Sequence, residues 1–236
     1  TPPVPKDLHW DLWLGPAPRR PYHPCYFKRR SISWQNWWDF GNGALGDMGS
    51  HTIDLPFWAL KLQYPTTVEA EGPLPVRAET YPDYLIVRWQ HPQRGKLPPV
   101  KLTWYDGHHR PKSPEGVDLM KWYLGIMFVG DKGILLADYR RRILLPEADF
   151  KDFQAPKPSI APSLGHHQEW IHACKTGAPT LCNFDYSGAL VENNLLGTVA
   201  FRVGKKLEWD PENLKARNCP EADRFLRPPY REGWTL

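Results

Sequence analysis

The chain has 236 residues, of which 41% are hydrophobic and 24% charged, and this ordinary globular composition excludes a disordered protein. The net charge is only +4, and the basic runs at residues 28–30 and 140–142 are too short for a nucleic-acid-binding face. No apolar run approaches the roughly 20 residues that span a bilayer. We therefore expect a soluble protein without nucleic-acid or membrane partners, in either the cytoplasm or the periplasm.

The chain begins with an extended, proline-rich stretch, and residues 1–7 read as a linker. Residues 8–42 are crowded with Trp, Pro, Tyr, Arg and His without a lasting period, which predicts an irregular, aromatic-rich loop region. Loops of this length in compact domains are usually functional. The candidate substrate-binding residues here are hydrogen-bond donors and flat rings, with surface exposure or packing as the alternative roles: Arg19, Tyr22, His23, Trp37 and Trp38.

A helix is predicted to begin near Gly43 and to run past Asp54, with Pro56 kinking it or ending its first part. Asp47 and His51 are four residues apart and Asp54 follows three later, so the three side chains share one helical face. An imidazole that titrates near neutral pH beside a carboxylate suits proton transfer. The alternative is a buried, hydrogen-bonded Asp47–His51 pair that only anchors the helix.

Strands dense in β-branched and aromatic residues are expected next, and two helices and a final strand follow them. The first helix, over residues 165–176, places Trp170, Ile171 and Cys174 on one apolar stripe. His167 at its start is a further candidate substrate contact, with capping or solvent exposure as the alternative. In chain order the predicted elements are strands 67–71, 84–89, 100–105, a hairpin over 125–137 and strand 142–145, helices 165–176 and 186–203, and strand 205–209.

Strands grouped in the middle with helices before and after predict an α+β fold. We expect one domain over residues 1–236, with a large, mainly antiparallel open sheet and helices on one face. A phosphate-binding glycine loop and the strand–helix alternation of a Rossmann domain are both missing from the sequence. Four free thiols are expected, with a Cys174–Cys182 disulfide as the alternative, and no metal-site spacing occurs.

The segment G-D-M-G-S-H-T-I-D, the preceding W-W-D-F-G-N-G-A-L and the later V-G-D-K-G turn resemble the C-terminal half of the glucose-fructose oxidoreductase and inositol dehydrogenase (Gfo/Idh/MocA) family. W-D-L-W-L-G-P-A-P-R-R-P-Y-H-P near the start and N-C-P-E-A-D near the end are similar to its bacterial branch of predicted dehydrogenases. The resemblance extends over nearly the whole chain, and the Asp/His motif is its most specific part.

This resemblance implies a substrate-binding and oligomerisation domain that follows a separate Rossmann domain for NAD or NADP. His51 would be the general acid/base that takes a hydroxyl proton from a sugar, sugar derivative or cyclitol. Asp47 would orient or polarise His51 or bind substrate, and Asp54 would contact substrate. A homo-oligomer through the open sheet face is also implied.

The family's Glu-Lys-Pro motif belongs to the nucleotide-binding half and has no counterpart here. We therefore expect no tight cofactor binding by this chain alone, and we expect it to be the second part of a longer NAD(P)-dependent oxidoreductase. The alternative is a non-catalytic carbohydrate-binding or assembly module without the cofactor domain.

Overall fold

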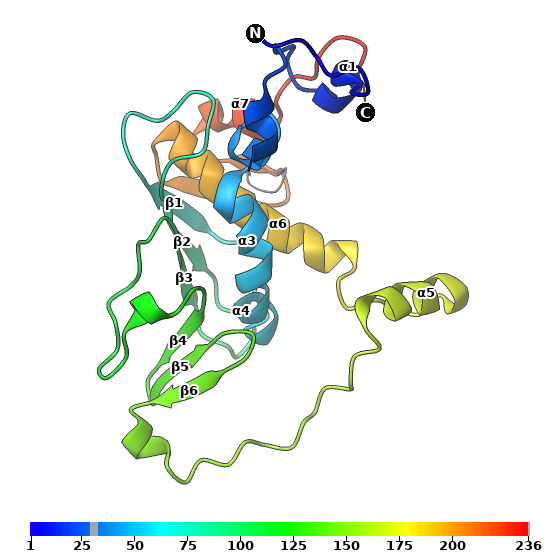
Figure 1. Cartoon of the computed structure of the whole chain (residues 1–236). Coiled ribbons are helices and arrows are strands. Elements are labelled where there is room, and N and C mark those ends of the chain that lie inside the picture. Colours follow the sequence, from blue (N-terminus) through cyan, green and yellow to red (C-terminus); the bar gives the residue numbers. More distant parts are fainter. Residues whose placement is uncertain (29–32, 236) are drawn as a thin grey trace.

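The computed structural model describes residues 1–28 and 33–235, so Arg29 and Arg30 of the first basic run lie outside the described part. The fold is α+β, as predicted, with two antiparallel sheets and helices on one side of the larger sheet (Figure 1). Every strand pair in the described residues is antiparallel, and these residues form no Rossmann domain. No helix in this part is long and apolar enough to cross a membrane.

The larger sheet has five strands in the order β3-β2-β1-β7-β8. One of its faces is apolar because alternate residues such as Val68, Val87 and Trp89 point to the same side and are buried. The next residues along each strand point to the other side. The strands are β1 (Thr67–Glu71), β2 (Ile86–His91), β3 (Val100–Tyr105), β7 (Leu207–Asp210) and β8 (Lys215–Ala216).

The opposite face of this sheet is polar. Glu69 pairs in register with Arg88, and Arg88 forms an ion pair with Glu71 at 3.0 Å. Ile86 also points to this face, but its large apolar side chain is buried and adds no exposed apolar surface. The uncovered face is therefore not an apolar surface that must be covered to be stable.

The smaller sheet is a three-stranded meander, with the predicted hairpin closed at Asp131 and Lys132. Its own small core joins Leu136 to Leu119 and Trp122. The strands are β4 (Ile126–Gly130), β5 (Gly133–Ala137) and β6 (Arg142–Leu145), and the 3-10 helix η3 (Leu119–Lys121) precedes them.

Three helices cover the apolar face of the larger sheet: α3 (Gly43–Thr52), α4 (Asp54–Ala59) and α6 (Phe184–Val203) (Figure 1). The predicted helix through the Asp/His motif is thus interrupted at Ile53. Pro56 explains the break, because its ring lacks an N–H and clashes with the carbonyl four residues earlier, at Thr52, where α3 ends.

The remaining helices are short, except for α5 (His166–Thr176), which ends at Gly177 as predicted, with φ of 73°. In the described residues of the aromatic-rich region 8–42, short helical turns alternate with irregular backbone. All four cysteines are free. The short helices are α1 (Trp10–Leu14), η1 (Pro24–Phe27), η2 (Ser33–Asn36), η4 (Glu147–Phe150), η5 (Pro220–Ala222) and α7 (Asp223–Leu226).

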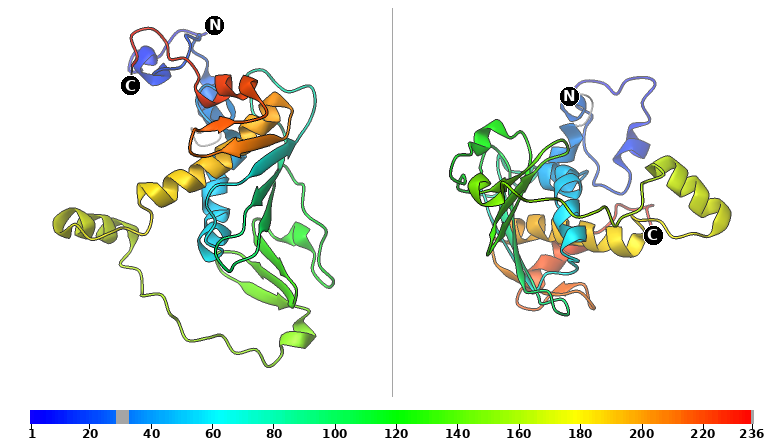
Figure 2. Two further views of the ribbon diagram at one scale, coloured as in Figure 1. Left: turned by 180° about the vertical axis from the view of Figure 1, so that it is seen from behind. Right: turned by 90° about the horizontal axis from the view of Figure 1, so that it is seen from below.

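The C-terminal tail lies near the N-terminal segment that contains α1 (Figures 1 and 2). Arg231 donates to the Asp11 carboxylate at 2.7 Å and to the Gly15 carbonyl at 2.8 Å. This link joins the C-terminal tail to the N-terminal segment.

Helix α3 packs closely on α6 because glycines stand at their contact. A Cβ atom on Gly197 would lie 2.8 Å from Leu45 and 2.9 Å from Val87, and one on Gly49 would lie 3.0 Å from the Asn194 amide. Leu45, Gly49 and Gly197 are all buried. This contact fixes which face of α3 is turned toward the core.

We predict that Gly197→Ala lowers the free energy of unfolding by about 1–3 kcal/mol, because the added methyl group must displace Leu45 or Val87. The matched control is Gly188→Ala in the same helix, where a Cβ atom meets nothing within 4 Å. That change should stabilise the protein by up to about 1 kcal/mol. Urea-induced unfolding measures both values, and similar effects of the two substitutions would contradict the close α3–α6 contact.

His91, at the end of β2, is a buried histidine with 1% exposure. Neither of its ring nitrogens has a hydrogen-bond partner among the described residues, and the same is true of the buried side-chain oxygen of Asn193. Burial, with the nearby Arg94 charge, lowers the pKa of His91 to about 4. The imidazole is therefore neutral in the folded state at neutral pH.

The folded-state pKa of His91 lies below the unfolded value, so the unfolded chain binds the proton more tightly. We predict that titration of His91 does not change the free energy of unfolding above about pH 6.5, and that roughly 3 kcal/mol is lost as the pH falls toward 4. The measurement is the free energy of unfolding from pH 7 to pH 4 for the wild type and His91→Leu. A parallel pH dependence in the two proteins would show that His91 is not the titrating group.

Candidate functional site

The Asp/His motif lies on the outer side of α3. Leu45 and Gly49 face α6 and are buried, so the helical repeat turns Asp47 and His51 toward solvent, and both are exposed. Neither side chain forms a hydrogen bond or an ion pair with any residue that the structure describes. The alternative of a buried Asp47–His51 pair that anchors the helix does not agree with this arrangement.

Asp54 lies one turn further on, at the first position of α4, and is half-buried. The Tyr186 hydroxyl donates to its carboxylate at 2.7 Å. Burial and this carboxylate raise the pKa of Tyr186 well above its ordinary value, so the phenol stays protonated. The bond ties the start of α6 to the start of α4, beside the motif.

Tyr139 is a second tyrosine near the motif, contributed by the turn between β5 and β6. Its hydroxyl donates to the main-chain carbonyl of His51 at 3.3 Å, and its side chain is 66% exposed. Asp138 shapes this turn by accepting from the backbone N–H groups of Arg140 and Arg141. The Arg141 guanidinium and these N–H groups lower the pKa of Asp138 to about 2.

Sequence reasoning missed both tyrosines. Tyr186 and Asp54 are separated by 132 positions, and Tyr139 and His51 by 88, so no local spacing connects them. The only signal was that both tyrosines lie at the edge of a predicted element. The site is thus an exposed surface of carboxylate, imidazole and hydroxyl groups, suited to polar hydrogen bonding and to proton transfer at His51.

Two hollows on the described surface share no residue with this site. One, of about 780 Å³, is bounded by Tyr64, Arg94 and Trp209. The other, of about 800 Å³, is bounded by Leu135, Leu144 and Phe153. Neither hollow is lined by Asp47, His51 or Asp54. The candidate site is therefore identified by its acid/base side chains and not by a cavity.

The candidate residues of the aromatic-rich region take part in packing. The Trp37 ring lies edge-on to Tyr26 at 5.0 Å, and the Arg20 guanidinium stacks over it at 5.3 Å. The Tyr22 ring lies edge-on to Trp10 at 5.4 Å. These rings build a small aromatic cluster of their own next to α1.

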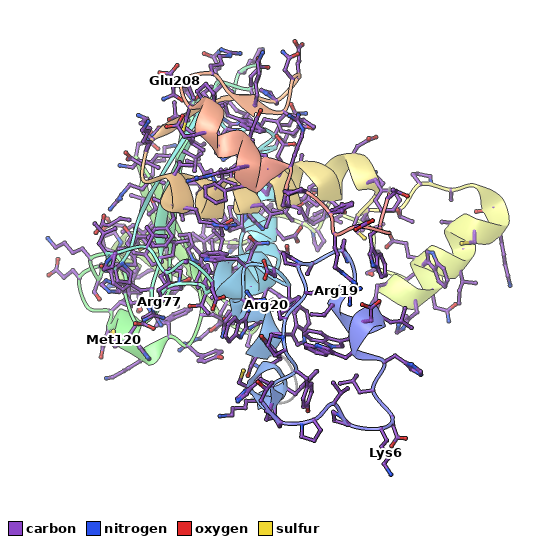
Figure 3. All side chains as sticks on the ribbon, turned by 90° about the horizontal axis from the view of Figure 1, so that it is seen from above. Lys6, Arg19, Arg20, Arg77, Met120 and Glu208 are labelled. Atoms are coloured by element: carbon purple, nitrogen blue, oxygen red, sulfur yellow. The ribbon has the colours of Figure 1, made fainter. Side chains whose placement is uncertain are left out.

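Arg20, which is 15% exposed at its side chain, joins this cluster to the rest of the chain. It donates to the Asp39 carboxylate at 2.7 Å and forms an ion pair with Glu79 at 3.2 Å. Arg19, its neighbour, instead forms an exposed ion pair with Asp11 at 3.3 Å. Both arginines lie in the N-terminal segment near α1 (Figure 3).

His23 has a local role, because its Nδ1 accepts from the Cys25 N–H at the start of η1. Trp38 packs against Tyr81, and the Arg202 guanidinium stacks over the Trp38 ring at 4.8 Å. Substrate contacts by the five residues of this region stay predictions, since the observed contacts are those of packing and surface ion pairs.

His167 lies on α5, which has no buried residue and stands apart from the motif (Figure 1). It is exposed, and its ring lies 4.1 Å from that of His166. No group of three or more His, Cys, Asp or Glu side chains suited to a metal ion occurs in the residues described.

The whole chain, residues 1–236, matches the sequence model of the Gfo/Idh/MocA type described as "Oxidoreductase family, C-terminal alpha/beta domain". The chain therefore belongs to this oxidoreductase family and forms its C-terminal α/β domain. This match confirms the family resemblance of the sequence. A comparison with curated proteins finds no match.

We predict that Tyr186→Phe lowers the free energy of unfolding by about 1 kcal/mol, because a hydrogen bond to the Asp54 carboxylate is lost. The matched control is Tyr139→Phe, whose exposed hydroxyl makes a longer bond to a carbonyl, and it should cost less than about 0.5 kcal/mol. Urea-induced unfolding compares the two variants. An equal or larger loss for Tyr139→Phe would contradict the role given to the Tyr186–Asp54 bond.

Proposed function

We propose that this chain is the substrate-binding and acid/base-bearing part of an NAD(P)-dependent oxidoreductase that acts on a sugar, sugar derivative or cyclitol. The observation that carries the proposal is the exposed Asp47–His51 stripe on α3 in a chain that belongs to an oxidoreductase family. A free imidazole at the surface is available to a substrate hydroxyl, whereas a buried, paired one is not.

In the proposed reaction a secondary alcohol of the substrate becomes a ketone. The O–H proton passes to an imidazole nitrogen of His51, which stores it and returns it in the reverse direction. The nicotinamide, when bound, supplies the acceptor for the hydride, which carries two electrons from the carbon. Asp47, one turn earlier, stabilises the imidazolium that forms or binds a neighbouring hydroxyl.

The described residues do not by themselves fit a dinucleotide. All their strand pairs are antiparallel, so they form no parallel strand pair with a phosphate-binding turn. We therefore assign the cofactor to a nucleotide-binding domain that precedes this one in the full-length protein. The contribution of this chain is the proton-transfer side of the site.

A polyhydroxylated substrate agrees with the groups around His51. Asp47 and Ser50 are exposed on α3, Asp54 is half-buried, and the Tyr139 hydroxyl lies at the His51 carbonyl. These side chains offer several acceptors and donors on one surface, which suits adjacent hydroxyl groups of a sugar or cyclitol. The candidate contacts Trp37, Trp38, Arg19, Tyr22, His23 and His167 remain secondary in this proposal.

Homo-oligomerisation through the open face of the larger sheet is also part of the proposal. Because this face carries Glu69, Arg88 and Gln90 rather than an apolar patch, the contact would depend on charge and hydrogen-bond complementarity. Such an interface should be sensitive to salt.

A second candidate function is a non-catalytic carbohydrate-binding or assembly module. The all-antiparallel strand pairing, without a dinucleotide-binding element, is the observation that favours it. The sequence before Thr1 distinguishes the two functions. A Rossmann glycine loop followed by Glu-Lys-Pro supports the enzyme, and a gene without them supports the module.

We predict that His51→Ala in the full-length protein lowers kcat by roughly a hundredfold or more, because proton transfer loses its acceptor. Nicotinamide affinity should be unchanged. The measurement is NAD(P) reduction with a panel of sugars, sugar derivatives and cyclitols, together with calorimetric cofactor titration. The control is His172→Ala, another exposed helical histidine. Unchanged turnover of His51→Ala would remove this residue from the mechanism.

A further inference from the structure

Residues 151–183 form an arm that leaves the body of the domain between η4 and α6. Every residue from 151 to 168 is exposed, and α5 within the arm has no buried residue. Residues 151–165, which precede α5, contain three prolines and form no helix or strand. In the views of Figures 1 and 2 the arm reaches away from the larger sheet on its helix-covered side.

Large apolar side chains are exposed along this arm instead of being buried. Trp170 on α5 is 66% exposed, and Phe184, where the arm joins α6, is 95% exposed. Exposed apolar side chains that lie together on one helix, as Trp170 and Ile171 do on α5, are typical of an interaction site. The other exposed apolar residues of the arm are Phe153, Ile160, Leu164, Ile171 and Leu181.

The helical repeat concentrates the apolar groups of α5 on one face. Trp170, Cys174, His167 and Ile171 fall within an arc of about 100°. The opposite side carries Gln168, His172, Glu169 and Lys175. An isolated helix of 11 residues is marginally stable in water, so α5 needs a surface to pack on.

The C-terminal end of the arm, where it joins α6, lies beside the candidate site. The arm ends at residue 183, and Tyr186, three residues on, donates to Asp54 at 2.7 Å. The connection from α5 to α6, residues 177–183, spans at most about 25 Å. A body that covers the exposed His51 stripe is therefore within reach of α5.

We infer that α5 is the docking element onto which the nucleotide-binding domain of the full-length protein packs. This inference rests on the proposed function, which requires a hydride acceptor over the exposed His51. A domain placed there excludes water from the acid/base stripe and covers Trp170 and Ile171 at the same time. His167, which lies on the same stripe of α5, would then be part of the contact between the two domains.

A second copy of the chain is a weaker occupant for this helix. Packing two α5 stripes together buries on the order of 400 Å² on each side, about half of what a standard stable interface needs per partner. A domain in the same polypeptide is held at a high effective concentration, so a smaller contact is sufficient.

The test is hydrogen–deuterium exchange of residues 166–176 in the full-length protein, with Trp170→Glu and the matched control Tyr123→Glu. Tyr123 is 91% exposed and lies outside the arm. We expect the α5 amides of the wild type and Tyr123→Glu to exchange at least tenfold more slowly than those of Trp170→Glu. Chemical cross-links from Lys175 should join α5 to residues N-terminal to Thr1 of the same chain.

Rapid exchange of α5 in the wild type would overturn the inference, whatever the enzymatic activity. Protection that disappears on dilution, with cross-links from Lys175 between differently labelled copies, would also overturn it and assign α5 to a dimer. Protected α5 with intramolecular cross-links in a protein that reduces no nicotinamide would support the docking and refute the proposed function. Exchange and cross-linking therefore test the docking of α5, whereas nicotinamide reduction tests the proposed function.

Discussion

The close contact between α3 and α6 determines which face of α3 is exposed to solvent. Gly197 and Gly49 allow the two helices to approach, and Leu45 fills the space between them. Because one side of α3 is committed to this contact, Asp47 and His51 must face outward. The same contact places α6 across the larger sheet, where its N-terminal end reaches Asp54 through Tyr186. The position of the acid/base stripe is therefore a consequence of backbone packing and not of hydrogen bonds within the stripe.

Some polar side chains of the domain are buried and paired, whereas others are exposed. Tyr81 and Trp104 both donate to the Asp106 carboxylate, and burial raises the pKa of that acid. Arg20 and its aromatic neighbours are similarly engaged in the N-terminal cluster. His51, in contrast, has no side-chain partner among the residues described. An imidazole without a fixed partner is available to exchange a proton with a bound molecule.

Family membership agrees with the architecture of the chain. The chain belongs to an oxidoreductase family as its C-terminal α/β domain, and its strands form antiparallel sheets. Its motif and α5 lie on the helix-covered side of the larger sheet, and the opposite face of that sheet is polar. The domain thus has two distinct surfaces, one with acid/base groups and exposed apolar side chains and one with paired charges.

The sequence alone determined the α+β class, the strands at residues 67–71, 100–105 and 142–145, and the family, because side-chain periodicity and turn residues act locally. It also placed Asp47 and His51 on one helical face. Only the tertiary structure decided that this face is exposed, that Tyr186 meets Asp54 across 132 positions, and that Trp37 and Tyr22 pack in a cluster. These features depend on which helix faces meet and on side chains far apart in the chain, and no local pattern encodes such contacts.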